Sequence, residues 1–82
     1  MHRYSILFEE ITDPGFPDGW YYAIVPMLNL TTHGKGIEGA RAAVMDLLQL
    51  WFAEKQAHGE EIPVEPAVFF TQVDIPDALQ VV

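Results

Sequence analysis

Apolar residues along the chain follow two different periods, and each period predicts one kind of element. From Ile37 to His58 no proline interrupts a run of helix-forming residues, and the apolar positions recur at three- and four-residue steps. Those positions are Ile37, Ala40, Val44, Leu47, Leu48 and Trp51. The spacing predicts one long helix that packs this face on a core. We expect it to stop at Gly59, a residue that readily adopts the left-handed conformation of a C′ position.

The apolar character of this helix extends beyond its core face. Further apolar residues lie well round the helix: Ala43, Met45, Leu50, Phe52 and Ala53. A surface helix of a small protein usually has an apolar stripe only a little over about 100° wide. We therefore expect the helix to contact both its own sheet and a second partner.

Alternation of apolar and polar positions predicts the strands. Arg3 to Glu9 alternates, and so does Trp20 to Pro26, with the turn residues of Thr12 to Gly19 (TDPGFPDG) between them. These two segments should form an antiparallel hairpin. Leu28 to His33 is expected to be a short third strand. Ala67 to Ile75 (AVFFTQVDI) is rich in β-branched and aromatic residues and is expected to be the last strand.

The predicted fold is α+β in the order β-β-β-α-β, an antiparallel-dominated sheet with the long helix packed on one face. The 82 residues form one domain over 1–82, in which 76–82 is a tail. A domain this small buries only about 60% of its unfolded-chain surface, and this one has no cysteine for a disulfide or a thiolate metal site. Oligomerisation or partner binding is therefore the expected source of extra stability.

Charge narrows the choice of partner. Twelve acidic residues stand against four basic ones, giving a formal net charge of −8. Nucleic-acid binding relies on lysine and arginine to neutralise phosphates, so direct binding of DNA or RNA is not expected. An acidic surface favours fast encounter with a basic protein, or it simply keeps an apolar protein soluble. With no membrane span and no secretory signal in the sequence, we expect a cytoplasmic protein.

Residues that could carry chemistry are scattered. His2, His33 and His58 are far apart in sequence and no H-E-x-x-H spacing occurs, so no metal site is expected. Nothing in the sequence places two carboxylates together, and there is no Gly-x-Ser-x-Gly elbow. Because catalytic groups are recognised by geometry and shifted pKa, we expect no catalytic residues and no enzymatic activity.

Gly34, Gly36 and Gly39 spell G-x-G-x-x-G between a strand and the helix. This spacing occurs in dinucleotide-binding turns, where an acidic residue follows about 20 positions later at the end of a second strand. Here that position falls near Glu54, inside the helix. The alternative is a tight strand-to-helix corner at Gly34 and Gly36, with Gly39 allowing close helix packing. We favour this alternative and expect no cofactor.

Neighbouring aromatic residues in a strand must point to opposite faces of the sheet. Trp20, Tyr21 and Tyr22 form such a run, and Phe69 and Phe70 form another, so at least one large ring looks away from the helix. A homo-oligomer, most simply a dimer, would cover that face. The expected partner-binding residues are Trp20, Tyr21, Met45, Phe52, Phe70, Glu60 and Glu61.

Several short segments, in this order, resemble the HicB-like antitoxin family from Arg3 to about Pro76. The segments of this chain are Asp18-Gly19-Trp20-Tyr21, Val25-Pro26, Thr32-His33-Gly34, Ile37-Glu38-Gly39-Ala40 and Ile62-Pro63. In the same order, they correspond to the family's D-G-G-Y, V-P, T-Q-G, L-E-E-A and I-P segments. The resemblance implies a binding module that neutralises a small basic HicA-type toxin ribonuclease by protein–protein contact. Acidic rims at Glu9 to Asp18 and at Glu60 to Glu65 would guide the toxin, and an exposed aromatic such as Trp20 or Phe52 would anchor it.

The chain also departs from the family. Pro26-Met27-Leu28-Asn29-Leu30 stands where the family has P-D-L-P-G-C, and Lys35-Gly36 replaces a helix-capping D-T. Many members carry a C-terminal DNA-binding domain, and none is expected within these residues. Two alternatives stay open: a stand-alone oligomeric scaffold domain without a toxin partner, and a small-ligand or nucleotide-binding protein that uses Gly34 to Gly39.

Overall fold

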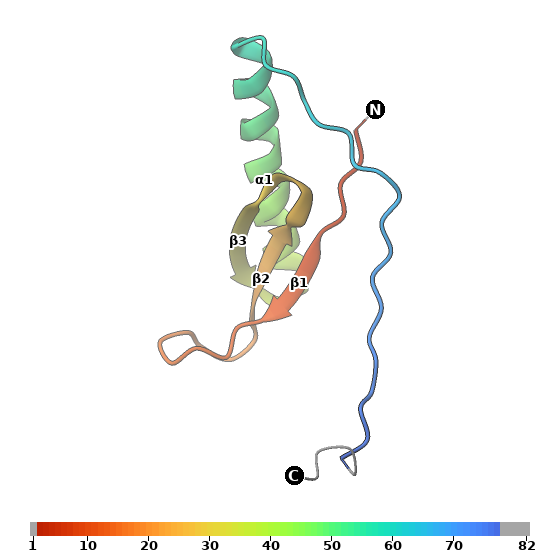
Figure 1. The fold of residues 1–82 in the computed structure, drawn as a ribbon. Coiled ribbons are helices and arrows are strands. Elements are labelled where there is room, and N and C mark those ends of the chain that lie inside the picture. Colours follow the sequence, from red (N-terminus) through yellow and green to blue (C-terminus); the bar gives the residue numbers. More distant parts are fainter. Residues whose placement is uncertain (1, 78–82) are drawn as a thin grey trace.

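A computed structural model describes residues 2–77 and has three strands followed by one long helix (Figure 1). The elements are β1 (Leu7–Glu10), β2 (Trp20–Val25), the short 3₁₀ helix η1 (Pro26–Leu28), β3 (Leu30–Lys35) and α1 (Gly36–Ala57). The sheet has the order β1-β2-β3, and both strand pairs are antiparallel. The α+β class and the predicted succession of three strands and a helix are confirmed.

β1 and β2 form the expected hairpin. Leu7 lies opposite Ile24, and Glu10 lies opposite Tyr21. The backbone N–H of Ile11 donates to the carbonyl of Trp20 at 2.9 Å, which extends the pairing by one residue past β1. The first strand is shorter than its alternating sequence suggested, because residues 2–6 pair with no other strand. This N-terminal segment (residues 2–6) lies beside α1 instead.

Both ends of α1 fall within one residue of the predicted helix. No side chain caps its start at Lys35, and the N–H of Gly36 donates to the carbonyl of Gly19 at 2.7 Å. At the other end Gly59 has a φ of 65°, a conformation that glycine adopts without steric cost. Its N–H donates to the carbonyl of Gln56 at 3.1 Å. Gly59 therefore ends the helix as the sequence indicated.

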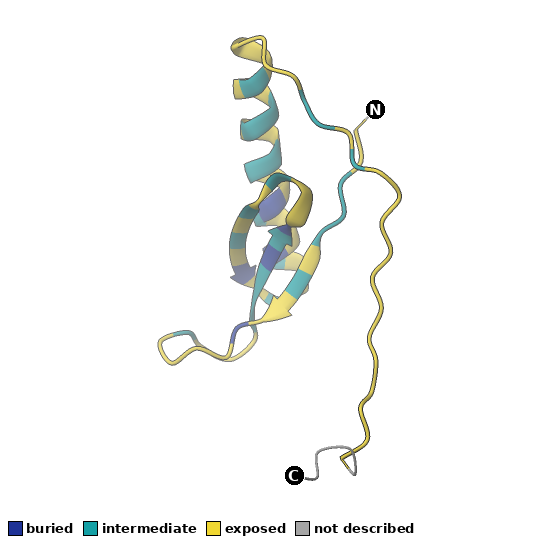
Figure 2. Ribbon diagram, in the orientation of Figure 1, coloured by how far each residue is buried: buried dark blue, intermediate teal, exposed yellow. Residues whose placement is uncertain are grey.

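The core between the sheet and α1 is small. Ala23 and Val25 of β2 and Ala40 and Val44 of α1 are fully buried. Partly buried apolar side chains surround them: Tyr4, Ile6, Phe8, Tyr21, Leu28, Leu30 and Leu48. Apart from Ile11, the buried positions in Figure 2 gather where β2 and β3 face α1. So few buried side chains leave little apolar area to stabilise the fold.

β3 and α1 approach each other through two glycines. A Cβ atom added to Gly34 would lie 2.4 Å from the carbonyl carbon of Gly39 and 2.5 Å from the nitrogen of Ala40. No side chain fits in that space, so glycine is the residue type at position 34 that permits the contact. The glycine spacing Gly34-x-Gly36-x-x-Gly39 is thus used for packing and for the corner, and the N–H of Gly36 already has a partner in the chain.

The structure corrects the prediction of a last strand over Ala67–Ile75. Residues 60–76 are in neither helix nor strand, and every residue from Pro66 to Asp77 is exposed. A strand is defined by the ladder that satisfies its N–H and C=O groups, and no described strand accompanies this segment. We call residues 66–77 the C-terminal arm; in Figure 1 it runs past the level of the sheet without joining it. Of the predicted tail, residues 78–82 lie outside the described part of the chain.

The chain exposes more surface than a compact protein of the same mass. Its accessible surface is 6710 Å², whereas a folded 9.2 kDa monomer exposes about 4,900 Å². The radius of gyration is 16.4 Å, compared with about 12 Å for a compact chain of this length. The C-terminal arm, which leaves the body of the molecule, accounts for the elongated shape.

Candidate functional site

The face of the sheet opposite α1 carries a group of rings. Alternate residues of β2 point away from the buried Ala23 and Val25, so Trp20 and Tyr22 belong to this open face. Phe16, from the β1–β2 loop, has its ring centroid 6.3 Å from both of them. The centroid of Phe16 lies 5.4 Å from that of His33 on β3. We call Phe16, Trp20, Tyr22 and His33 the aromatic cluster.

Carboxylates border the aromatic cluster. The Tyr22 hydroxyl donates to Oδ2 of Asp13 at 3.0 Å, and Glu9 lies opposite Tyr22 in the β1–β2 ladder. The hydrogen bond to Asp13, followed by burial and by the charges of Asp13 and Glu9, raises the pKa of Tyr22 above 10.0. The open face therefore combines apolar rings at its centre with negative charge at its edge.

The structure resolves which of the adjacent β2 rings faces outward. Trp20 is half-buried on the open face because Phe16 and His33 pack against it. Tyr21 lies on the other side, opposite Gly34 in the ladder, and packs on the core. Of these two expected partner-binding residues, Trp20 is on the candidate surface and Tyr21 is on the helix side. The part played by Phe16 was missed because alternation assigns no face to a loop residue.

Met45 and Phe52 lie together on α1, as expected from the broad apolar character of the helix. They line a groove of about 480 Å³ between α1 and the N-terminal segment. The Phe52 ring is half-buried, with its centroid 5.8 Å from that of Tyr4 and 5.4 Å from that of His2. Met45 is 45% exposed. Part of the second partner expected for the helix is therefore the chain's own N-terminal segment.

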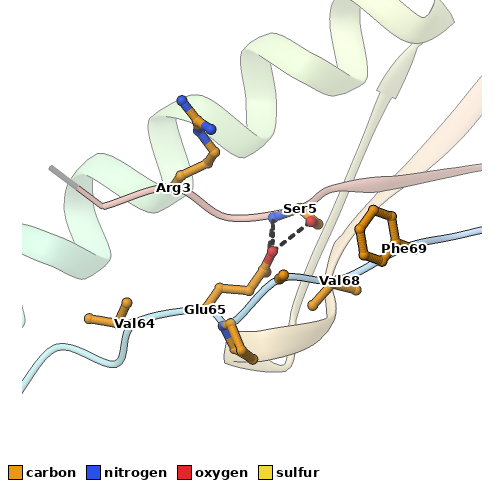
Figure 3. Close-up of a pocket in the computed structure, with 8 residues that line it drawn as sticks. Arg3, Ser5, Val64, Glu65, Val68 and Phe69 are labelled. Atoms are coloured by element: carbon orange, nitrogen blue, oxygen red, sulfur yellow. Dashed lines mark hydrogen bonds between the residues drawn. The ribbon is translucent and has the colours of Figure 1, made fainter.

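A set of hydrogen bonds fastens the start of the C-terminal arm to the N-terminal segment (Figure 3). The backbone N–H of Ser5 donates to both carboxylate oxygens of Glu65, at 2.9 and 3.1 Å. The Ser5 hydroxyl also donates to Oε2 of Glu65 at 2.6 Å. One residue earlier, the Tyr4 hydroxyl donates to the carbonyl of Pro63. We call these contacts the Glu65 anchor.

The Glu65 anchor shifts the pKa values of its members. The Ser5 hydroxyl and then the Ser5 N–H lower the pKa of Glu65 from 4.5, since both donate to the ionised carboxylate. Burial, and then the negative charge of Glu65, raise the pKa of Tyr4. No sequence signal identified this contact, because Ser5 and Glu65 are 60 positions apart. Acids in a connector are normally assigned to solvent.

The two expected acids at the end of the helix differ in their surroundings. Oε2 of Glu60 lies 3.3 Å from Nζ of Lys55, and that ammonium group lies 5.5 Å from the centroid of the Trp51 ring. Glu60 thus helps to fold the chain back after α1. Glu61 is exposed, so its charge is available to an approaching molecule.

Phe70, the last of the expected partner-binding residues, lies on the C-terminal arm. It is 56% exposed, and its neighbour Phe69 is 92% exposed. Val73 and Ile75 are 74% and 60% exposed. The structure therefore separates Phe70 from the aromatic cluster and from the groove of Met45 and Phe52. Three apolar surfaces result, on the sheet, on the helix and on the arm.

Two classes of site are absent from residues 2–77. No three side chains among the described histidines, aspartates and glutamates are placed to hold a metal ion. Over the same residues, no helix combines the length and the apolar character needed to cross a bilayer.

The chain matched no protein-family model, no curated protein and no solved structure. The resemblance to HicB-like antitoxins stays a prediction that rests on the sequence segments quoted above.

Proposed function

We propose that this protein is a HicB-like, antitoxin-type binding module that neutralises a small basic HicA-type toxin ribonuclease by protein–protein contact. The observation that carries the proposal is the open face of the sheet, where Phe16, Trp20, Tyr22 and His33 are bordered by carboxylates. Interfaces draw most of their affinity from a few aromatic anchors surrounded by polar groups. A ribonuclease surface that holds RNA must be positive, and a net charge of −8 complements it.

The proposal assigns separate tasks to the rings and to the charges. Negative groups such as Glu9 and Glu61 attract the partner and raise the association rate, whereas Trp20 slows dissociation once its ring is covered. Because Trp20 and Phe52 are half-buried, each is held in place before binding and loses little side-chain freedom. A toxin that cleaves cellular RNA is met in the cytoplasm, and the proposal places the protein there.

Co-expression with a small basic protein encoded in the neighbouring reading frame tests this function. Growth should recover when this protein is present, and the two proteins should co-elute in gel filtration at low salt. Trp20→Ala should weaken the complex by about 2 kcal/mol or more, the scale of an interface hot spot. Leu50→Ala is the matched control, because Leu50 is 71% exposed on α1, away from the open face.

A specific observation favours a second candidate, the stand-alone scaffold domain. The exposed apolar arm gives the chain a means of assembling with itself, which a scaffold needs and a toxin inhibitor does not require. Failure to bind any neighbouring basic protein at low salt would overturn the antitoxin proposal and leave this candidate.

A further inference from the structure

The C-terminal arm has the composition of a strand but no ladder. Its segment Ala67–Ile75 is built mainly from β-branched and aromatic residues and holds one charged side chain, Asp74. Every one of these residues is exposed, with Phe69 at 92%. An extended apolar segment whose backbone groups form no ladder adds readily to an open sheet edge.

The sheet offers such an edge at β1. In the order β1-β2-β3, β1 pairs only with β2, so one side of Leu7–Glu10 has no neighbouring strand among the described residues. The arm starts next to this edge, because Glu65, the residue before the arm, accepts hydrogen bonds from Ser5, which is two residues before Leu7. Pro63 and Pro66 fix φ on either side of the anchor. In Figure 1 the arm runs past its own β1 without forming a strand beside it.

The surplus surface of the chain matches an interface between two copies. The accessible surface of 6710 Å² exceeds that of a compact monomer of this mass by about 1,800 Å². If two copies each buried that surplus, the interface would total about 3,600 Å², within the range of obligate homodimers. The charge of the arm also favours a second copy as its partner. Ala67–Ile75 is nearly uncharged and therefore has little electrostatic attraction for a basic toxin.

We infer that two copies of this chain exchange their C-terminal arms, so that Ala67–Ile75 of each copy adds as a fourth strand to the β1 edge of the other. A two-fold axis makes both contacts identical and closes the assembly. The exchange supplies the ladder that the arm lacks and places one of the adjacent rings Phe69 and Phe70 on the helix side of the partner's sheet. It does not depend on the antitoxin proposal, and it leaves the aromatic cluster open.

Light scattering on the full-length chain tests the exchange at micromolar concentration. The expected mass is twice 9.2 kDa. Val68→Pro together with Val73→Pro should raise the dimer dissociation constant at least tenfold, because proline cannot donate to a ladder. Neither N–H has a partner in the described chain, so folding is not affected. Leu50→Asp, on the helix surface, should leave the dimer intact. A wild-type monomer, or a proline variant that dimerises as before, overturns the inference.

Cross-linking distinguishes exchange from pairing within one chain. The protein has no cysteine, so Glu9→Cys and Thr71→Cys can be introduced singly and the two variants mixed. A short bismaleimide should then link one chain of each kind into a covalent dimer. A third variant carries both cysteines in one chain. If the bismaleimide links these two cysteines only within the same chain, the arm lies on its own β1 and the exchange is disproved.

Discussion

Gly34 of β3 and Gly39 of α1 are in backbone contact, with no room between them for the Cβ atom of any other residue at position 34. Gly34→Ala forces that atom to 2.4 Å from a backbone carbon, and backbone cannot yield as a flexible side chain can. We expect a loss of about 3 kcal/mol in the free energy of unfolding, as in severe overpacking. Urea denaturation followed by circular dichroism measures it.

Gly39→Ala is the matched control for this contact. A Cβ at Gly39 would meet its nearest atoms at 3.5 to 3.9 Å, an ordinary van der Waals distance. Because alanine is the better helix former, this variant should be unchanged or more stable by up to about 1 kcal/mol. Equal destabilisation by both substitutions would show that the contact does not depend on the Gly34 side alone.

Val44→Ala should remove a large share of the stability of such a small core. Val44 is fully buried against Ala23 and Val25. Loss of two methyl groups and the cavity that remains cost about 2 kcal/mol. Leu50→Ala, at a position 71% exposed on the same helix, should change the free energy of unfolding by less than about 0.5 kcal/mol. Similar midpoints for the two variants would contradict the placement of the core.

The Glu65 anchor should weaken in acid. Its donors lower the folded-state pKa of Glu65 from 4.5, so the unfolded chain binds more protons than the folded chain between these two pKa values. The contribution to stability is therefore complete above pH 4.5 and is lost as the pH falls through the lowered folded pKa. Hydrogen exchange of the Ser5 amide reports the loss. Glu65→Gln should exchange faster at neutral pH and should lack this acid-dependent step.

Salt should act on the rate at which a basic toxin binds and hardly on the rate at which it leaves. Raising ionic strength from 0.1 to 1 M shortens the screening length from about 10 to about 3 Å. Steering by the acidic rim is then lost, whereas the covered rings are not affected. Glu61→Gln should reproduce a small part of the effect. Stopped-flow mixing measures both rate constants. If the dissociation rate constant rises with salt by as large a factor as the association rate constant falls, the charges do not act on association alone.

Local periodicity was sufficient to predict most of the fold. The helix and the hairpin follow from the spacing of apolar residues within single segments, and Gly59 ends α1 where the sequence placed it. The face of β2 that meets α1 was not assigned, since alternation divides the residues into two faces but does not say which face is buried. The small side chain of Ala23 was the available signal, because a helix can approach closely only over small residues.

The remaining features depend on contacts that no segment contains by itself. Ala67–Ile75 has strand propensity, but a ladder needs a neighbouring strand, and the sequence does not say which chain provides it. Ser5 and Glu65 are ordinary surface residues until the fold brings them together. Phe16 joins Trp20 through a loop whose path the turn residues do not determine. Expected binding residues were therefore found on three surfaces rather than in one site.

The Glu65 anchor joins two points between which all the described strands and the helix lie, 60 positions apart along the chain. A pulling force applied to the two ends of the protein would reach Ser5 and Glu65 before it reached β1 or α1. The hydrogen bonds of the anchor would carry the load together, and the sheet would stay unloaded until they parted. Under mechanical tension, this pair of ordinary polar residues acts as the first barrier to unravelling.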